Sequence, residues 1–182
     1  MRPRDSNTVA RRISNMGLAA LVIASFALSA APWPHWRSFD SHGVSYRYPP
    51  GWVATAAPLT AVTSPQQIIA LASFPFPTNV AGADGCEPKE ALDRIPPNGV
   101  FIFGWEYGQL SPQLGIRPHD FPPRPKHFTL TNLAQYECMG RSYMLRFSDR
   151  EWAFQIHVFF GSRASVATRA TALRILDSFT VK

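Results

Sequence analysis

The stretch Val100-Phe-Ile-Phe-Gly-Trp-Glu-Tyr107 is apolar on both of the faces that a β-strand would present. Successive side chains of a strand point to opposite sides, so two sets of residues separate here. Phe101, Phe103, Trp105 and Tyr107 share one face, and Val100 and Ile102 share the other. A strand that is covered on both faces lies in the middle of its sheet. We therefore predict that residues 100–107 form the central strand of the core.

Residues 141–160 show the alternation of a β-hairpin. A turn at Asp149-Arg150 pairs apolar residues on one face: Phe147 with Trp152, Leu145 with Phe154, and Tyr143 with Ile156. Cross-strand pairs of this kind stabilise a sheet. The opposite face is predicted to be a mixed surface that carries Met144, Arg146, Gln155 and His157. A four-residue tip with the same register fits the pattern equally well.

Alternation and turn residues predict three further strands, at residues 43–48, from Trp52 onward and at residues 68–74. The first two are separated by the turn Pro49-Pro50-Gly51. Residues 179–181 are expected to form a short terminal strand or a tail.

Two segments predict helices. Residues 87–94 read as a short helix that Pro96-Pro97 would end. A longer closing helix is expected after a cap at Ser162 or Ser165. Its predicted buried stripe consists of Val166, Ala170, Leu173 and Leu176. The order of strands and helices predicts a single α+β domain over residues 37–182, built as an antiparallel sheet flanked by helices.

The N-terminus has the layout of an export signal. Four basic residues, Arg2, Arg4, Arg11 and Arg12, precede an uncharged apolar run at residues 16–31. Such a run enters the bilayer while the cations stay in the cytoplasm. Cleavage before Ala30 and retention as an uncleaved hydrophobic anchor helix are both open. In either case residues 1–36 form the leader or anchor, and the domain at 37–182 lies outside the cytoplasm, tethered to the cell membrane or secreted.

Cys86 and Cys138 are the only cysteines. They belong to no C-x-x-C motif and no Cys/His cluster that would indicate zinc binding or redox chemistry. In an oxidising compartment such a pair most simply forms a disulfide bond. Closing a loop of about fifty residues would stabilise the fold by about 4 kcal/mol in the chain-entropy model.

Composition and charge exclude several classes. The 182 residues are 46% hydrophobic and 16% charged, which does not fit a disordered chain, a collagen or a coiled coil. The formal net charge is +6, and residues 1–30 supply half of it. The remaining charge is too small to indicate binding to nucleic acid.

Both ends of the domain resemble a known family. Residues 43–52 (GVSYRYPPGW) are similar to the strand–turn–tryptophan opening of PsbP/Mog-type proteins, and residues 172–179 (ALRILDSF) resemble their final helix. Short exported proteins of high-GC actinobacteria show the same leader, opening and close. The resemblance implies an antiparallel sheet flanked by helices and an accessory or binding role without a shared active site. It carries over no functional residue, because the proline-rich loop and the cysteines depart from the family pattern.

No catalytic or cofactor motif is present in the sequence. It lacks a G-x-S-x-G elbow, a phosphate-binding glycine loop and the histidine spacing of a metal site, so no metal and no cofactor are expected. Glu106 stands out because it lies on an otherwise apolar strand, next to Gly104 and Gly108. It is either a buried acid with a raised pKa or the exposed end of the strand.

Residues 111–127 (SPQLGIRPHDFPPRPKH) form a proline-rich connection that is longer than a sheet requires. Its candidate ligand-binding residues are basic or become so below about pH 6.5: Arg117, His119, Arg124, Lys126 and His127. One interpretation is a site for an anionic envelope component or another protein. The other is a stiff cover over one face of the sheet, with its charges in solvent.

These observations predict a non-enzymatic binding or accessory module outside the cytoplasm, with the cell membrane as a partner through residues 16–31. Two alternatives are a small hydrolase that uses Glu106 with a loop histidine and a purely structural envelope component.

Overall fold

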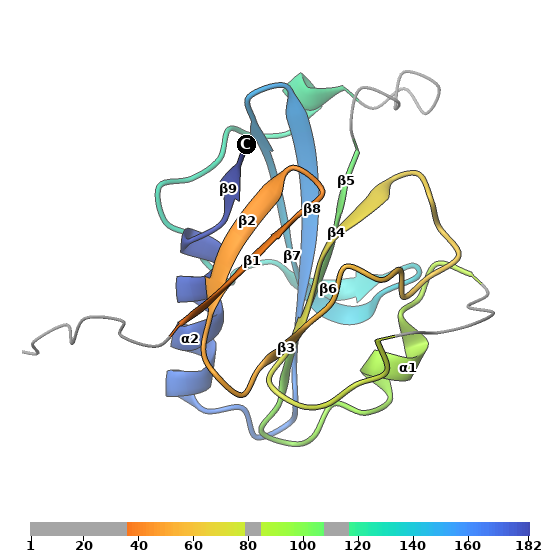
Figure 1. The fold of residues 1–182 in the computed structure, drawn as a ribbon, viewed down its shortest axis with the longest axis vertical. Helices are drawn as coiled ribbons and strands as arrows, with labels where there is room; N and C mark the ends of the chain where they lie inside the picture. The colour runs from red at the N-terminus through yellow and green to blue at the C-terminus, as the bar shows by residue number, and fades with distance from the viewer. Residues whose placement is uncertain (1–35, 79–84, 108–116) are drawn as a thin grey trace, which may run out of the picture. The chain divides into compact units, whose positions relative to one another are not determined.

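The computed structural model describes residues 36–78, 85–107 and 117–182. These residues form a mostly β fold with one three-stranded and one six-stranded antiparallel sheet and two short helices (Figure 1). The predicted leader or anchor at residues 16–31 lies outside the described residues. Within the described ranges, neither helix has the length and apolar character that crossing a membrane requires.

The larger sheet is built around the strand that the sequence predicts to be central. Its strands run in the order β3 (Val53–Ala54), β4 (Gln66–Ala72), β5 (Val100–Glu106), β8 (Trp152–Phe160), β7 (Gly140–Asp149) and β6 (Leu133–Tyr136). Val100 and Ile102 of β5 belong to one hydrophobic cluster. Phe101, Phe103 and Trp105 belong to a second cluster on the opposite face. The prediction of a central strand buried on both faces is therefore confirmed.

The smaller sheet consists of β1 (Arg37–Ser41), β2 (Val44–Tyr48) and β9 (Thr180–Val181). His42 and Gly43 connect β1 to β2, with φ angles of 51° and 74°. Positive φ at both central residues is the geometry of a type I′ turn, which matches the twist of the strands that it joins. The second sheet corrects the expectation of a single sheet flanked by helices. It exists because β2 pairs with the distant β9, a long-range contact that local alternation does not reveal.

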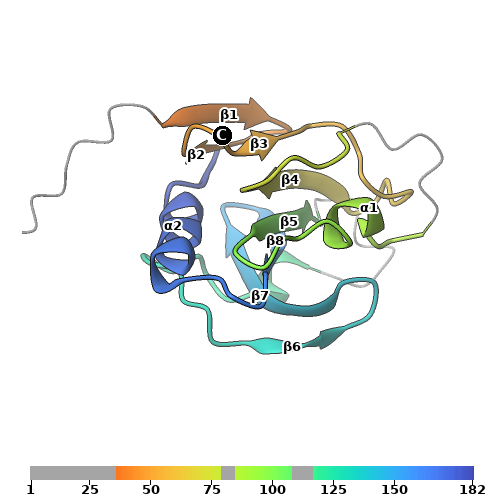
Figure 2. The ribbon, with the colours of Figure 1, turned by 90° about the horizontal axis from the view of Figure 1, so that it is seen from below.

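The two helices occupy the predicted segments. Helix α1 spans only Lys89–Leu92, inside the predicted range 87–94. Helix α2 spans Val166–Asp177, and the N–H of Thr168 donates to the Ser165 side chain at 3.1 Å, which confirms Ser165 as the cap. Figure 2 shows α2 beside the larger sheet, near β1 and β2.

The predicted stripe of α2 is wrong for its first half. The buried residues are Ala172, Ile175 and Leu176, whereas Val166 is 85% exposed and Ala170 is also exposed. The buried trio packs in one cluster with Phe179, just beyond the helix. The fully buried residues of the helix thus lie in its C-terminal half, whereas Val166, Ala167 and Ala170 face solvent.

The β7–β8 hairpin forms with a register two residues away from the predicted one. Asp149 pairs with Trp152, Phe147 with Phe154, Leu145 with Ile156, and Tyr143 with Val158. The turn is Arg150-Glu151, and Arg150 has a φ of 57°, which suits a two-residue turn with positive φ at its first position. A shift of two residues keeps every side chain on its predicted face, because side chains alternate with a period of two.

The second face of this hairpin is the expected mixed surface only in part, because Arg146 is exposed but His157 is buried. His157 has no exposed area, and Ser142 is 1% exposed. Trp105 and Tyr136 place their rings edge-on to His157, at 6.2 and 5.3 Å between centroids. The face is covered because Tyr136 and Met139, around the β6–β7 turn, pack with Trp105 in the second cluster.

A disulfide bond joins Cys86, three residues before α1, to Cys138 in the turn between β6 and β7. The Cα atoms are 5.3 Å apart, and the two residues are 52 positions apart in the sequence. The predicted pairing is confirmed. Disulfides persist in oxidising surroundings, so this bond fits an extracytoplasmic compartment.

Candidate functional site

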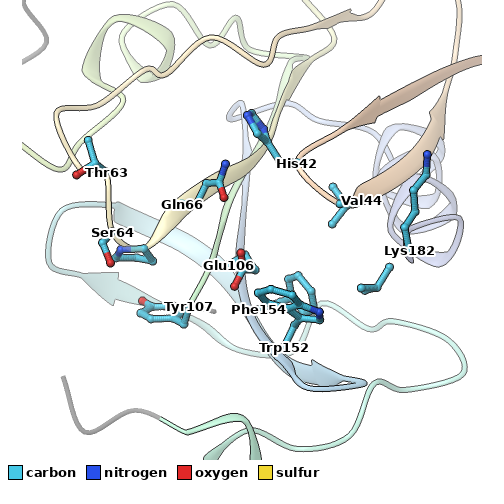
Figure 3. Close-up of a pocket in the computed structure, with 13 residues that line it drawn as sticks. His42, Val44, Thr63, Ser64, Gln66, Glu106, Tyr107, Trp152, Phe154 and Lys182 are labelled. Carbon is cyan, nitrogen blue, oxygen red and sulfur yellow. The ribbon is translucent and has the colours of Figure 1, made fainter. Parts of the chain in front are cut away.

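An open pocket with a volume of about 530 Å³ lies between the two sheets (Figure 3). The smaller sheet contributes the β1–β2 turn with His42, the start of β2 with Val44, and the end of β9 with Val181. The larger sheet contributes the start of β4, the end of β5 and the start of β8. Both sheets therefore supply walls, and the volume lies in the range of small-molecule sites.

The strand register explains which side chains meet at the larger sheet. Glu106 is the last residue of β5, and it pairs with Gln66 of β4 and with Phe154 of β8. Directly paired residues share a face of a sheet, and Trp152 lies on the same face because it is two residues from Phe154. A carboxylate, an amide and two aromatic rings are thus placed side by side. Figure 3 shows the Glu106 carboxylate close to Phe154 and Trp152 in this view.

The pocket combines apolar walls with a few polar groups. Phe154 is 1% exposed, Val44 is also buried, and Trp152 is half-buried. Exposed Gln66 and Thr63 and half-buried Glu106 add polar atoms. Ligand sites typically combine an apolar lining with a small number of placed polar groups. Glu106, the residue that the sequence singled out, is thus both the end of its strand and part of a pocket wall.

Backbone and side-chain contacts fix the edge of the pocket on the smaller sheet. The Lys182 N–H donates to the Gly43 carbonyl at 2.9 Å, and Lys182 Nζ forms an ion pair with Asp40. The hydroxyls of Ser45 and Thr180 are 2.7 Å apart. These contacts hold the last residues of the chain against the β1–β2 hairpin.

The described part of the proline-rich segment, residues 117–127, does not line the pocket. Phe121 is buried, and the Ser148 N–H on β7 donates to the Pro122 carbonyl at 2.7 Å. The Arg124 N–H in turn donates to the Ser148 carbonyl at 2.8 Å. The Arg146 guanidinium sits 4.2 Å from the centroid of the Phe121 ring. Residues 121–124 therefore lie along β7, while residues 108–116 are outside the described residues.

The structure separates the five predicted binding residues into two groups. Arg124 and His127 meet at the end of α2, where Arg124 Nη2 donates to the Asp177 carbonyl at 3.2 Å and His127 Nδ1 is 3.2 Å from Asp177 Oδ2. Arg117, His119 and Lys126 have exposed side chains. None of these five residues, all in the described part of the chain, lines the pocket. Their assignment to an anionic partner stays a prediction.

The two histidines of the proline-rich segment, His119 and His127, do not line the pocket. His119 Nε2 lies 3.6 Å from Asp120 Oδ1, and His127 contacts Asp177. Among the described residues that line the pocket with Glu106, the histidine is His42, from the β1–β2 turn. In the described part of the chain, no three His, Cys, Asp or Glu side chains are placed to hold a metal ion.

A row of hydrogen-bonded polar side chains crosses the larger sheet. It was not predicted from the sequence. Ser142 Oγ is 2.8 Å from His157 Nδ1, Gln155 Nε2 is 2.9 Å from His157 Nε2, and the Tyr107 hydroxyl donates to Gln155 Oε1 at 3.4 Å. Burial lowers the pKa of His157 to about 4, so the ring is neutral at pH 7. A serine next to a histidine suggests a nucleophile, but both side chains are closed to any substrate. We assign Ser142 and His157 to the interior of the fold.

No protein-family model matches this sequence, and no curated protein matches it. The pocket geometry therefore carries the functional argument.

Proposed function

We propose that this chain is an exported, non-enzymatic binding or accessory domain that holds a small ligand between its two sheets. The observation that carries the proposal is the pocket itself, whose walls come from both sheets and combine aromatic rings with a carboxylate. The N-terminal apolar run and the Cys86–Cys138 disulfide support a place outside the cytoplasm, either tethered to the membrane or secreted. The resemblance of both ends to PsbP/Mog-type proteins supports an accessory role.

A binding role also fits the side chains that the pocket presents. Its lining includes one carboxylate from a strand end and one histidine from a tight turn, while the Ser142–His157 pair is sealed in the interior. A nucleophilic hydrolase needs its serine and its base to reach the substrate together. Ser142 and His157 do not meet this requirement at the pocket, because both are buried and neither lines it.

Filling the pocket tests the proposal. Thr63 is exposed and lines the pocket, so Thr63→Trp should obstruct it. Suitable probes are cyclohexylmethanol, cyclohexylmethylammonium and cyclohexanecarboxylate, which share an apolar ring and differ in charge. We expect at least one probe to bind the purified full chain with a millimolar Kd by calorimetry, and Thr63→Trp to weaken that binding at least tenfold.

The matched control is Thr131→Trp, which adds the same ring at an exposed position that does not line the pocket. This variant should bind like the unmodified chain. Equal binding by Thr63→Trp and Thr131→Trp, or binding of no probe by the unmodified chain, would contradict the proposed function.

A further inference from the structure

We propose that the pocket is selective for a small organic cation, an amine or quaternary ammonium with an apolar body. In this assignment Glu106 is the counter-ion, and the half-buried ring of Trp152 is the aromatic surface against which the cation packs. The inference rests on the proposed binding function and names its ligand class.

The charges around the pocket favour a cation. Among the described residues that line it, Glu106 is the one acidic side chain. Lys182 is the one lysine or arginine in that lining, and its Nζ is already in an ion pair with Asp40. The charge of Lys182 is thus offset at the edge of the pocket. An anionic ligand would meet Glu106 as a like charge.

The aromatic side chains strengthen the same preference. Phe154 is paired directly with Glu106 across β5 and β8, and Trp152 follows on the same face. The face of an aromatic ring carries negative charge density, so it attracts a cation placed over it, and tryptophan is the best such partner. A carboxylate beside aromatic rings offers an organic cation both an ion pair and cation–π contact. A neutral compound of the same shape gains neither of these.

The size of the pocket points to an organic ion. A volume of about 530 Å³ greatly exceeds that of a single water molecule or an ammonium ion. Val44, Pro65 and Val181 supply apolar surface around the carboxylate and the rings. A cation that carries a ring or a branched alkyl group can therefore bury its body against these side chains while its nitrogen approaches Glu106.

The experiment compares the three probes at pH 8 and low salt, where an ordinary histidine is neutral and exposed charges are weakly screened. We expect cyclohexylmethylammonium to bind the full chain about tenfold more tightly than cyclohexylmethanol, and cyclohexanecarboxylate to bind most weakly. Adding 0.5 M sodium chloride should reduce the advantage of the cation over the alcohol.

Two variants separate the contributions of the carboxylate and the ring. Glu106→Gln should bring the affinity for the cation down to that for the alcohol, with little change for the alcohol. Trp152→Leu keeps an apolar wall, and it should weaken cation binding about threefold through the loss of cation–π attraction. The matched control is Glu90→Gln, which removes one negative charge from an exposed position on α1 and should leave the preference intact.

The relative affinities of the three probes show whether the pocket prefers a cation. If the alcohol or the carboxylate binds the unmodified chain as tightly as the cation, the cation preference is wrong while the binding function stands. The same holds if Glu106→Gln keeps the preference. If none of the three probes binds, the proposed function fails and this inference fails with it.

Discussion

His157 is enclosed by the larger sheet, where Ser142 and Gln155 contact its two ring nitrogens. Its neutral form is favoured because burial removes the ring from water, which lowers its pKa from the ordinary value of 6.5 to about 4. The unfolded chain takes up a proton near pH 6.5, whereas the folded chain does so only near pH 4. Acid therefore favours the unfolded state over this window.

We predict that the free energy of unfolding falls by up to about 3 kcal/mol between pH 7 and pH 4 because of His157 alone. In His157→Gln that loss should disappear, since glutamine does not titrate. Urea unfolding at a series of pH values measures the slope. His119→Gln is the control, because the His119 side chain is exposed. An equal slope in His157→Gln and in the unmodified chain would contradict the account.

Arg124 was predicted to bind a ligand, and the structure gives it several contacts within the fold. Its guanidinium donates to the Asp177 carbonyl, lies 3.9 Å from Asp149 and sits 5.6 Å from the centroid of the Phe128 ring. Its side chain is 25% exposed. Basic residues in a proline-rich loop look alike in the sequence, and only the fold shows which of them meet a partner in the protein.

Arg124→Ala is therefore expected to lower the free energy of unfolding by about 1–2 kcal/mol, through lost hydrogen bonding and packing. Lys126→Ala, two residues away and exposed, should change it by less than about 0.5 kcal/mol. Chemical denaturation of both variants provides the measurement. A stable Arg124→Ala variant would show that these contacts contribute little.

At the scale of elements, the hairpin of β7 and β8 shows what alternation determines and what it leaves open. Alternation assigned every side chain of the hairpin to its face, because a residue's face depends only on its odd or even position. It did not determine the register, which depends on the turn. The turn uses Arg150 at a φ of 57°, a conformation that few residues other than glycine, asparagine and aspartate favour. The sequence therefore indicated a turn at Asp149-Arg150, whereas the turn is at Arg150-Glu151.

Just after β8, the backbone at Gly161 lies directly against the backbone of residues 96–99. The Gly161 N–H donates to the Gly99 carbonyl at 2.9 Å, and a Cβ atom at Gly161 would overlap the carbonyl oxygens of Pro96 and Pro97. We predict that Gly161→Ala lowers the free energy of unfolding by about 1–3 kcal/mol, because the backbone must move to admit a methyl group. Thermal unfolding of Gly161→Ala against Ser162→Ala, an exposed neighbour, tests this. Equal stability of the two variants would rule out the close approach.

At the scale of the whole molecule, the contacts that could not be predicted from the sequence are those between segments far apart along the chain. Strand β1 was not predicted, because most of its residues are exposed and it carries little apolar pattern. Pairing between β2 and β9 joins residues that are more than 130 positions apart. These two features create the smaller sheet and with it one side of the pocket. Glu106 could be singled out from sequence, but its neighbours His42, Trp152 and Lys182 could not.

The disulfide is the one long-range contact that the sequence did predict, because the chain has only two cysteines and its N-terminus has the layout of an export signal. We predict that Cys86→Ser with Cys138→Ser lowers the free energy of unfolding by about 4 kcal/mol, through the added freedom of the unfolded chain. Urea unfolding under non-reducing conditions measures the difference. The mass of the purified, unreduced chain should also lack two hydrogens. Two free thiols in the purified protein would contradict both statements.

The central claim is that the space between the two sheets is a ligand site, and a chemical-shift map of the isotope-labelled chain tests it most directly. On titration with cyclohexylmethylammonium, the account predicts that the signals of Gln66, Glu106 and the Trp152 indole shift together and saturate. It also predicts that the same signals stay in place in Thr63→Trp. Shifts confined to Arg117, Lys126 and their neighbours, or no saturable shift at all, would contradict the claim.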